Sequence, residues 1–115
     1  MDNIREIIMQ CQEDSENMFP ATAMDISYHT LSLAGEVGEF CNELKKVARG
    51  SQSMQEAYPR LSDELVDVFI YVCTIAAVLK IDLGVEYDIK RGFNLRRFVA
   101  DAAAGSANDD SDGEG

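Results

Sequence analysis

The sequence predicts an all-α fold in which four helices form one domain. Apolar residues recur at intervals of three and four positions, which is typical of helices with one buried face, and no segment shows the strict alternation of a strand. Capping residues, glycines and prolines separate the stretches that carry this pattern. With 115 residues, the chain can bury only a modest core, so we expect it to assemble as a homo-oligomeric helical bundle.

The first two helices are bounded by local signals. The first is predicted to end near Met18, because Pro20 disfavours helical backbone in the residue before it. The second is predicted to run from Asp25, as its N-cap, to Arg49, with Gly50 as the stop.

The third and fourth helices follow a predicted loop. Residues 51–60 are mostly polar and include a proline, which favours a loop. Ser62 is then the predicted cap of a third helix that runs to about Lys80, and its apolar residues cover almost every face, so it belongs at the centre of a bundle or in a subunit interface. A fourth helix is predicted from Asp82 or Gly84 through Phe98.

The charge of the chain is strongly negative and unevenly distributed. We assign residues 1–100 to the domain and residues 101–115 to an acidic tail, predicted to be disordered because it loses the apolar pattern. The formal net charge of -11 argues against binding of nucleic-acid polymers or anionic membranes as the main activity, since phosphate contacts need clustered Lys and Arg.

The cysteines and the N-terminus favour a cytoplasmic location. Cys11, Cys41 and Cys73 are odd in number, widely spaced and set in apolar context, so they are predicted to be buried thiols. The first residues carry charges and no long apolar region, so no signal peptide is predicted. The most apolar run, residues 68–79, is shorter than the roughly 20 residues that span a bilayer, so no membrane segment is expected.

Two acidic pairs stand within the predicted second and third helices. Glu36 and Glu39 are three positions apart, as are Glu64 and Asp67, and residues three apart on a helix share a face. Because apolar residues flank both pairs, four carboxylates would approach a core where they repel one another unless a cation lies between them. Oxygen ligands without thiolates or imidazoles suit Mg²⁺ or Mn²⁺. Such pairs are also common on exposed helix faces, where Glu is simply a good helix former.

A row of polar and basic residues on one face of the predicted fourth helix suits a polyphosphate. Lys90, Asn94 and Arg97 follow one another at intervals of four and three and so present one ammonium, one amide and one guanidinium along the same side. Cations near the end of a helix can equally complement its dipole or form surface ion pairs.

Three segments in this order, HTLSLAGEVGEFCNELKKVARG, LSDELVDVFIYVCTIAAVLKIDL and KRGFNLRRF, resemble the MazG-type all-α nucleoside triphosphate pyrophosphohydrolases over about residues 25–98. The resemblance implies a four-helix MazG-like module that forms dimers or tetramers. It also implies hydrolysis of (d)NTP between the α and β phosphates, which gives (d)NMP and pyrophosphate with Mg²⁺ or Mn²⁺ as cofactor.

The resemblance also assigns roles to individual residues. The metal ligands would be Glu36, Glu39, Glu64 and Asp67, and one of the two glutamates of the first pair would activate the attacking water. Substrate contacts would come from residues that can reach phosphate, Lys46, Lys90, Asn94 and Arg97. We add His29, nearly two turns before Glu36, as a contact to the base or ribose, although a histidine of the core fits the pattern as well.

The sequence therefore predicts a metal-dependent nucleoside triphosphate pyrophosphohydrolase. Two alternatives remain open. One is a nonenzymatic helical interaction protein whose acids are solvated. The other is a related hydrolase that acts on nucleoside diphosphates or on phosphoribosyl-ATP-like substrates.

Overall fold

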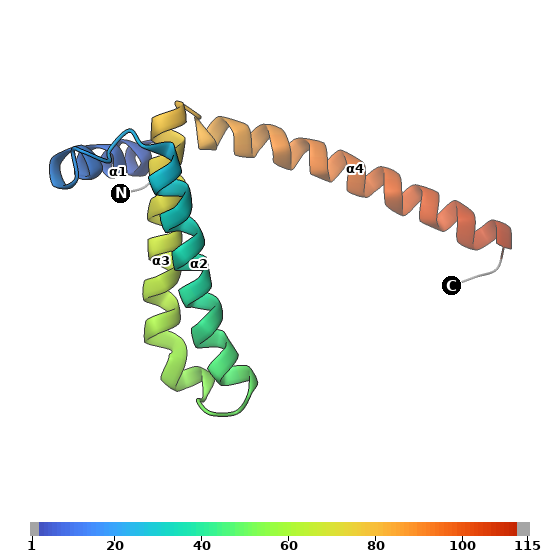
Figure 1. The fold of residues 1–115 in the computed structure, drawn as a ribbon. Coiled ribbons are helices and arrows are strands. Elements are labelled where there is room, and N and C mark those ends of the chain that lie inside the picture. The colour runs from blue at the N-terminus through green and yellow to red at the C-terminus, as the bar shows by residue number, and fades with distance from the viewer. Residues whose placement is uncertain (1–2, 113–115) are drawn as a thin grey trace. The chain divides into compact units, whose positions relative to one another are not determined.

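The computed structural model describes residues 3–112 and is built from helices alone (Figure 1). The elements are α1 (Ile4–Met18), α2 (Ile26–Ala48), α3 (Met54–Leu79) and α4 (Leu83–Asp112). No strand occurs within residues 3–112. The prediction of an all-α fold with four helices is confirmed.

The contacts divide the chain into two compact units, Met1–Ile81 and Asp82–Gly115. In the first unit, α2 and α3 lie side by side in opposite directions, and α1 packs against α3 (Figure 1). The second unit contains α4.

The core of the first unit is made largely of small side chains. Ala57 and Cys73 are fully buried, and Ala76 is nearly so, which lets the neighbouring helices approach α3 closely. Cys11 of α1 and Cys73 of α3 form a buried thiol pair, and burial is the main cause that raises the pKa of Cys73 to about 11. Cys41, by contrast, is exposed, so the prediction that it is buried is wrong for the single chain.

The predicted limits of the first two helices are confirmed. α1 ends at Met18, and α2 begins after Asp25, whose side chain accepts a hydrogen bond of 3.0 Å from the backbone of Tyr28. After Arg49 caps α2, Gly50 takes the left-handed conformation, with φ at 82°, that glycine adopts without strain.

The start of α3 differs from the prediction, since the helix begins at Met54 rather than after Ser62. Ser53 and Glu56 form a capping box, in which the Glu56 backbone N–H donates to Ser53 Oγ at 3.1 Å and the Ser53 N–H donates to Glu56 Oε1 at 3.3 Å. The capping box gives partners to the first backbone N–H groups of α3 and so stabilises the start of the helix. Pro59 lies inside this helix, where its missing N–H removes one internal hydrogen bond.

α4 begins at its predicted start but extends beyond its predicted end. It begins as predicted after Asp82, whose side chain accepts from the backbone of Val85 at 3.2 Å. It then continues to Asp112, through residues 101–112 of the segment predicted as a disordered tail. Three consecutive alanines follow Asp101, and alanine has the highest helix propensity. Residues 113–115 lie outside the described part, and the domain boundary at residue 100 stays a prediction.

The apolar pattern around α3 is only partly explained by contacts within the first unit. Leu65 and Val66 are 55% and 53% exposed, and Phe69 is 41% exposed. An apolar groove of about 810 Å³ runs over α2 and α3, lined among others by Phe40, Leu44, Leu61, Leu65, Phe69 and Val72. This apolar groove leaves a large hydrophobic surface open on the single chain.

Within the described residues, no single helix is both long and apolar enough to cross a membrane, although α3 and α4 counted together meet that requirement of length and composition.

Candidate metal centre and adjoining pocket

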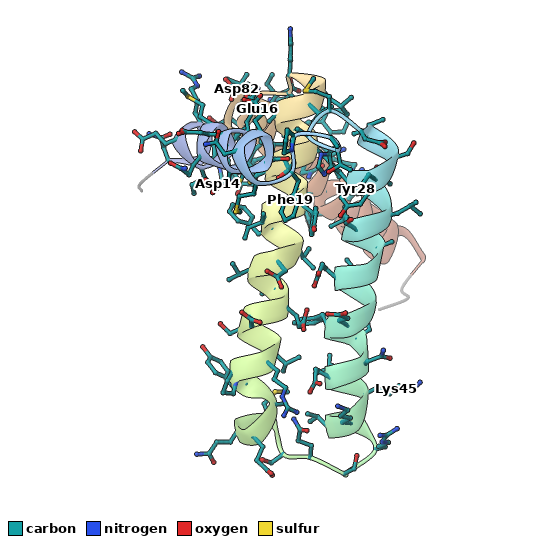
Figure 2. All side chains as sticks on the ribbon, turned by 60° about the vertical axis from the view of Figure 1, so that its left-hand side comes forward. Asp14, Glu16, Phe19, Tyr28, Lys45 and Asp82 are labelled. Atoms are coloured by element: carbon teal, nitrogen blue, oxygen red, sulfur yellow. The ribbon has the colours of Figure 1, made fainter. Side chains whose placement is uncertain are left out.

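The two acidic pairs meet where α2 and α3 face each other. Glu36, Glu64 and Asp67 each offer a carboxylate oxygen, and these oxygens lie within 4.8 Å of one another. All three residues are half-buried, whereas Glu39 is exposed. Figure 2 shows side-chain oxygen atoms in the space between the two helices. The antiparallel pairing thus brings Glu36 close to two residues that lie 28 and 31 positions further along the chain.

The electrostatics of Glu64 show how close these carboxylates are. A hydrogen bond with Glu36, followed by burial and by the hydrogen bond and charge of Glu39, raises the pKa of Glu64 to about 7. The fourth predicted ligand, Glu39, therefore also interacts with the group. Without a cation, a proton reduces the repulsion that four negative charges would create.

Two buried oxygen atoms allow a test of whether a metal ion fits this place. Glu36 Oε2 and Glu64 Oε2 are buried and have no hydrogen-bond partner among the described residues. A buried acceptor without a partner is costly, and buried polar groups are rarely left so. A divalent cation would partner both oxygens, and a donor set of carboxylates alone suits a hard ion. The residues therefore fit an oxygen-bound divalent cation.

A pocket of about 420 Å³ adjoins the acidic group toward the loop between α2 and α3. Its walls combine acidic and basic side chains, Glu39, Glu43, Glu64, Lys45, Lys46 and Arg49, together with Asn42. The predicted substrate residue Lys46 therefore lies beside the acidic group. Lys45 stands at the outer side of α2 and points away from α3 (Figure 2).

Glu43 links the basic side chains of the two helices. Lys46 Nζ donates to Glu43 Oε1 at 3.0 Å, and Arg60 of α3 lies 3.9 Å from Glu43 Oε2. The Lys46 hydrogen bond lowers the pKa of Glu43. Arg60 is not among the predicted site residues because the sequence favours a loop over residues 51–60, whereas the earlier start of α3 sets Arg60 one turn before Glu64.

His29 is a residue of the core. Its side chain is only 3% exposed, and Nε2 donates to the backbone carbonyl of Ala23 at 3.0 Å, because a carbonyl can only accept. The ring also meets Tyr28 edge-on at 5.7 Å and lies 6.4 Å from Tyr71. Figure 2 shows Tyr28 near Phe19, and these aromatic residues help to line a separate hollow of about 220 Å³. The hydrogen bond gives His29 a structural role, and its contact with substrate stays a prediction.

The remaining predicted substrate residues all lie on α4, in the second unit. Lys90 and Arg97 are exposed, and Asn94 is half-buried with an Oδ1 atom that has no hydrogen-bond partner among the described residues. Because α4 belongs to a different unit from the acidic group, the meeting of these three side chains with that group stays a prediction.

The chain is similar to two curated proteins. It is 36% identical to human dCTP pyrophosphatase 1 over 81 residues, which are 67% of this chain and 48% of that protein. It is 40% identical to the Gene 37 protein of Mycobacterium phage L5 over 61 residues, which are 51% of this chain and 54% of that protein. The chain thus spans about half the length of both relatives. No protein-family model and no solved structure matches it.

Proposed function

We propose that this protein is a divalent-metal-dependent pyrophosphohydrolase that converts (d)NTP and water into (d)NMP and pyrophosphate. The observation that carries the proposal is the meeting of carboxylates from α2 and α3, with two buried oxygens that lack a partner. The similarity to a protein named dCTP pyrophosphatase 1 supports the same class of reaction. dCTP therefore belongs among the first substrates to test.

The proposed roles follow from the positions of the side chains. Glu36, Glu39, Glu64 and Asp67 would hold Mg²⁺ or Mn²⁺. When bound, the ion supplies positive charge for the phosphates and lowers the pKa of a coordinated water. A glutamate of the first pair, Glu36 or Glu39, orients the attacking water and accepts its proton. The water oxygen forms a bond to the α phosphorus, the bond from that phosphorus to the bridging α–β oxygen breaks, and pyrophosphate leaves.

A second copy of the chain is the proposed occupant of the apolar groove. The core of the single chain consists mainly of small residues, while large apolar side chains of α3 remain exposed. Burial of apolar surface contributes roughly 25 cal/mol per Å², so a small domain gains much of its stability by pairing such faces. This proposal accounts for the all-round apolar pattern of α3.

The same apolar groove favours a second candidate function, that of a nonenzymatic helical interaction protein. In that case, the acidic group would bind no metal at working concentrations and no nucleotide would be hydrolysed. A hydrolase for nucleoside diphosphates or phosphoribosyl-ATP-like substrates is a further alternative that differs in its products. The cytoplasmic location stays a prediction from the sequence.

Three single substitutions test the proposed reaction. Glu36→Gln, Glu64→Gln and Asp67→Asn each remove one carboxylate with little change of shape, so the proteins should remain helical by circular dichroism and lose pyrophosphate release. Asp63→Asn is the matched control, because Asp63 is an exposed neighbour on α3 outside the acidic group. Wild-type rates in all three variants would exclude the proposed site, and turnover of diphosphates in place of triphosphates would favour the related hydrolase.

A further inference from the structure

The facing sides of α2 and α3 change from acidic to basic in the same direction. On α2, Glu36, Glu39, Glu43 and Lys46 follow at intervals of three and four, so they form one stripe. On α3, Asp67, Glu64 and Arg60 form the opposing stripe when they are taken in reverse order. Because the helices are antiparallel, both stripes become basic toward the loop that joins them (Figure 1).

The ion pairs of Glu43 support this arrangement. The Glu43 carboxylate lies between the two basic stripe ends, 3.0 Å from Lys46 and 3.9 Å from Arg60. Arg49 is held beside them, since its Nε donates to Ser51 Oγ at 3.0 Å and that hydroxyl donates to the carbonyl of Lys46 at 3.1 Å. We call the three residues Lys46, Arg49 and Arg60 the basic end of the two stripes.

Favourable interaction with a helix dipole explains the positions of Lys46 and Arg49 but not that of Arg60. Lys46 and Arg49 lie at the C-terminal end of α2, where cations complement the helix dipole. Arg60 lies near the opposite, N-terminal end of its own helix, where the dipole gives a cation no advantage. Its side chain is 66% exposed and its ion pair with Glu43 is long, so it remains available to another anion.

The pocket joins Lys46 and Arg49 of this basic end to the acidic group, and Arg60 reaches it through Glu43, which also lines the pocket. Glu39 and Glu64 form part of the walls of the same hollow of about 420 Å³ as Lys46 and Arg49. Lys46 is seven residues beyond Glu39 on α2, which corresponds to a rise of about 10 Å along nearly the same face. An extended polyphosphate with flexible lysine and arginine side chains reaching toward it can span this interval.

We infer that the basic end binds the pyrophosphate part of the substrate, with the α phosphate beside the carboxylates and the leaving group directed toward the loop between α2 and α3. This assignment rests on the proposed function and adds Arg49 and Arg60 to the substrate-binding residues. Most of the negative charge of a nucleoside triphosphate lies on its terminal phosphates, whereas the nucleoside is neutral. The order of acidic and basic residues along the two stripes therefore fixes the direction in which the substrate lies.

Binding of separate parts of the substrate tests the inference without turnover. Titration calorimetry with Mg²⁺ present would compare sodium pyrophosphate, a nucleoside monophosphate and a nucleoside triphosphate whose α–β bridge is a methylene group. Lys46→Gln, Arg49→Gln and Arg60→Gln should each weaken pyrophosphate and the analogue about tenfold, as expected for loss of a hydrogen bond to a charged group. The affinity for the monophosphate should change less than about twofold, and Arg49→Lys should keep part of the lost affinity.

Lys80→Gln is the matched control, because it removes one positive charge of the first unit at the other end of α3. It should leave all three affinities unchanged. Circular dichroism of each variant shows whether the helices are retained.

The outcomes separate this inference from the proposed function. A wild-type protein that forms monophosphate while its three variants keep full affinity for pyrophosphate would overturn only the inference. Variants that weaken free pyrophosphate but not the analogue would overturn the placement of the leaving group. A wild-type protein that hydrolyses no triphosphate would overturn the proposed function and the leaving-group assignment with it.

Discussion

Replacing Glu64 with glutamine should change the stability of the protein in opposite directions with and without divalent metal. In the metal-free protein, the hydrogen bond with Glu36, burial and Glu39 raise the pKa of Glu64 from 4.5 to about 7. Between these values the folded protein retains a proton that the unfolded chain has released. The contribution of Glu64 to stability is therefore complete below pH 4.5 and is lost as the pH rises through about 7.

Glutamine has no such proton, so the variant escapes this loss. With chelator, Glu64→Gln should melt at a higher temperature than wild type near pH 8, and the difference should shrink toward pH 5.5. With metal, the wild type should have the higher melting temperature, because the variant lacks one of the three clustered carboxylates. Metal at 100 times its dissociation constant stabilises a folded protein by about 2.7 kcal/mol. For a domain of this size, that corresponds to a rise in melting temperature on the order of 10 °C.

Differential scanning calorimetry in EDTA, MgCl₂ and MnCl₂ measures both effects. Asp63→Asn removes the same charge from the neighbouring part of α3 and should behave as wild type in each buffer. The reasoning is refuted if metal raises the melting temperature of the Glu64 variant as much as that of wild type. It is also refuted if the variant gains no stability in chelator at pH 8, because the carboxylates would then not repel one another.

Three further predictions follow from the packing. Ser53→Ala removes the hydrogen bond to the first turn of α3 and should lower the free energy of unfolding by about 1 kcal/mol in urea titrations, whereas Ser62→Ala, at an exposed position within the helix, should be nearly neutral. In a thiol-labelling assay, Cys41 should react at once and the buried thiol pair only as the protein unfolds, because burial raises the pKa of both thiols. Phe69→Glu places a charge in the apolar groove and should convert the oligomer to a monomer in light scattering, with helix content retained. Equal losses in both serine variants, rapid labelling of all three thiols, or an unchanged mass for the Phe69 variant would contradict the respective predictions.

The first two helices could be predicted because their limits depend on neighbouring residues. Asp25 caps the backbone three positions later, and Gly50 takes a conformation that few other residues tolerate. The start of α3 differs from the prediction because the polar residues and Pro59 of residues 51–60 favour a loop, whereas Ser53 and Glu56 form a capping box that starts the helix at Met54. The proline removes one hydrogen bond, while the box and the buried turn around Ala57 stabilise the helix start.

The candidate site was predictable only in part. Three-residue spacing places each acidic pair on one helix face, and in the structure carboxylate oxygens of Glu36, Glu64 and Asp67 lie within 4.8 Å of one another. Spacing gives no register between α2 and α3, so it could not show that Glu39 is more exposed than the others or that Arg60 meets Glu43. These facts depend on the antiparallel pairing of whole helices.

The proposed function is hydrolysis of the α–β bond of a nucleoside triphosphate with the help of metal held by the acidic group. Chromatography of the products from a panel of ribo- and deoxynucleoside triphosphates, dCTP included, tests it most directly when each reaction is run with Mg²⁺, with Mn²⁺ and with chelator. Equal amounts of monophosphate and pyrophosphate, formed with metal and absent with chelator, are the predicted result. Diphosphate with inorganic phosphate, turnover in chelator, or no turnover of any triphosphate would contradict the claim.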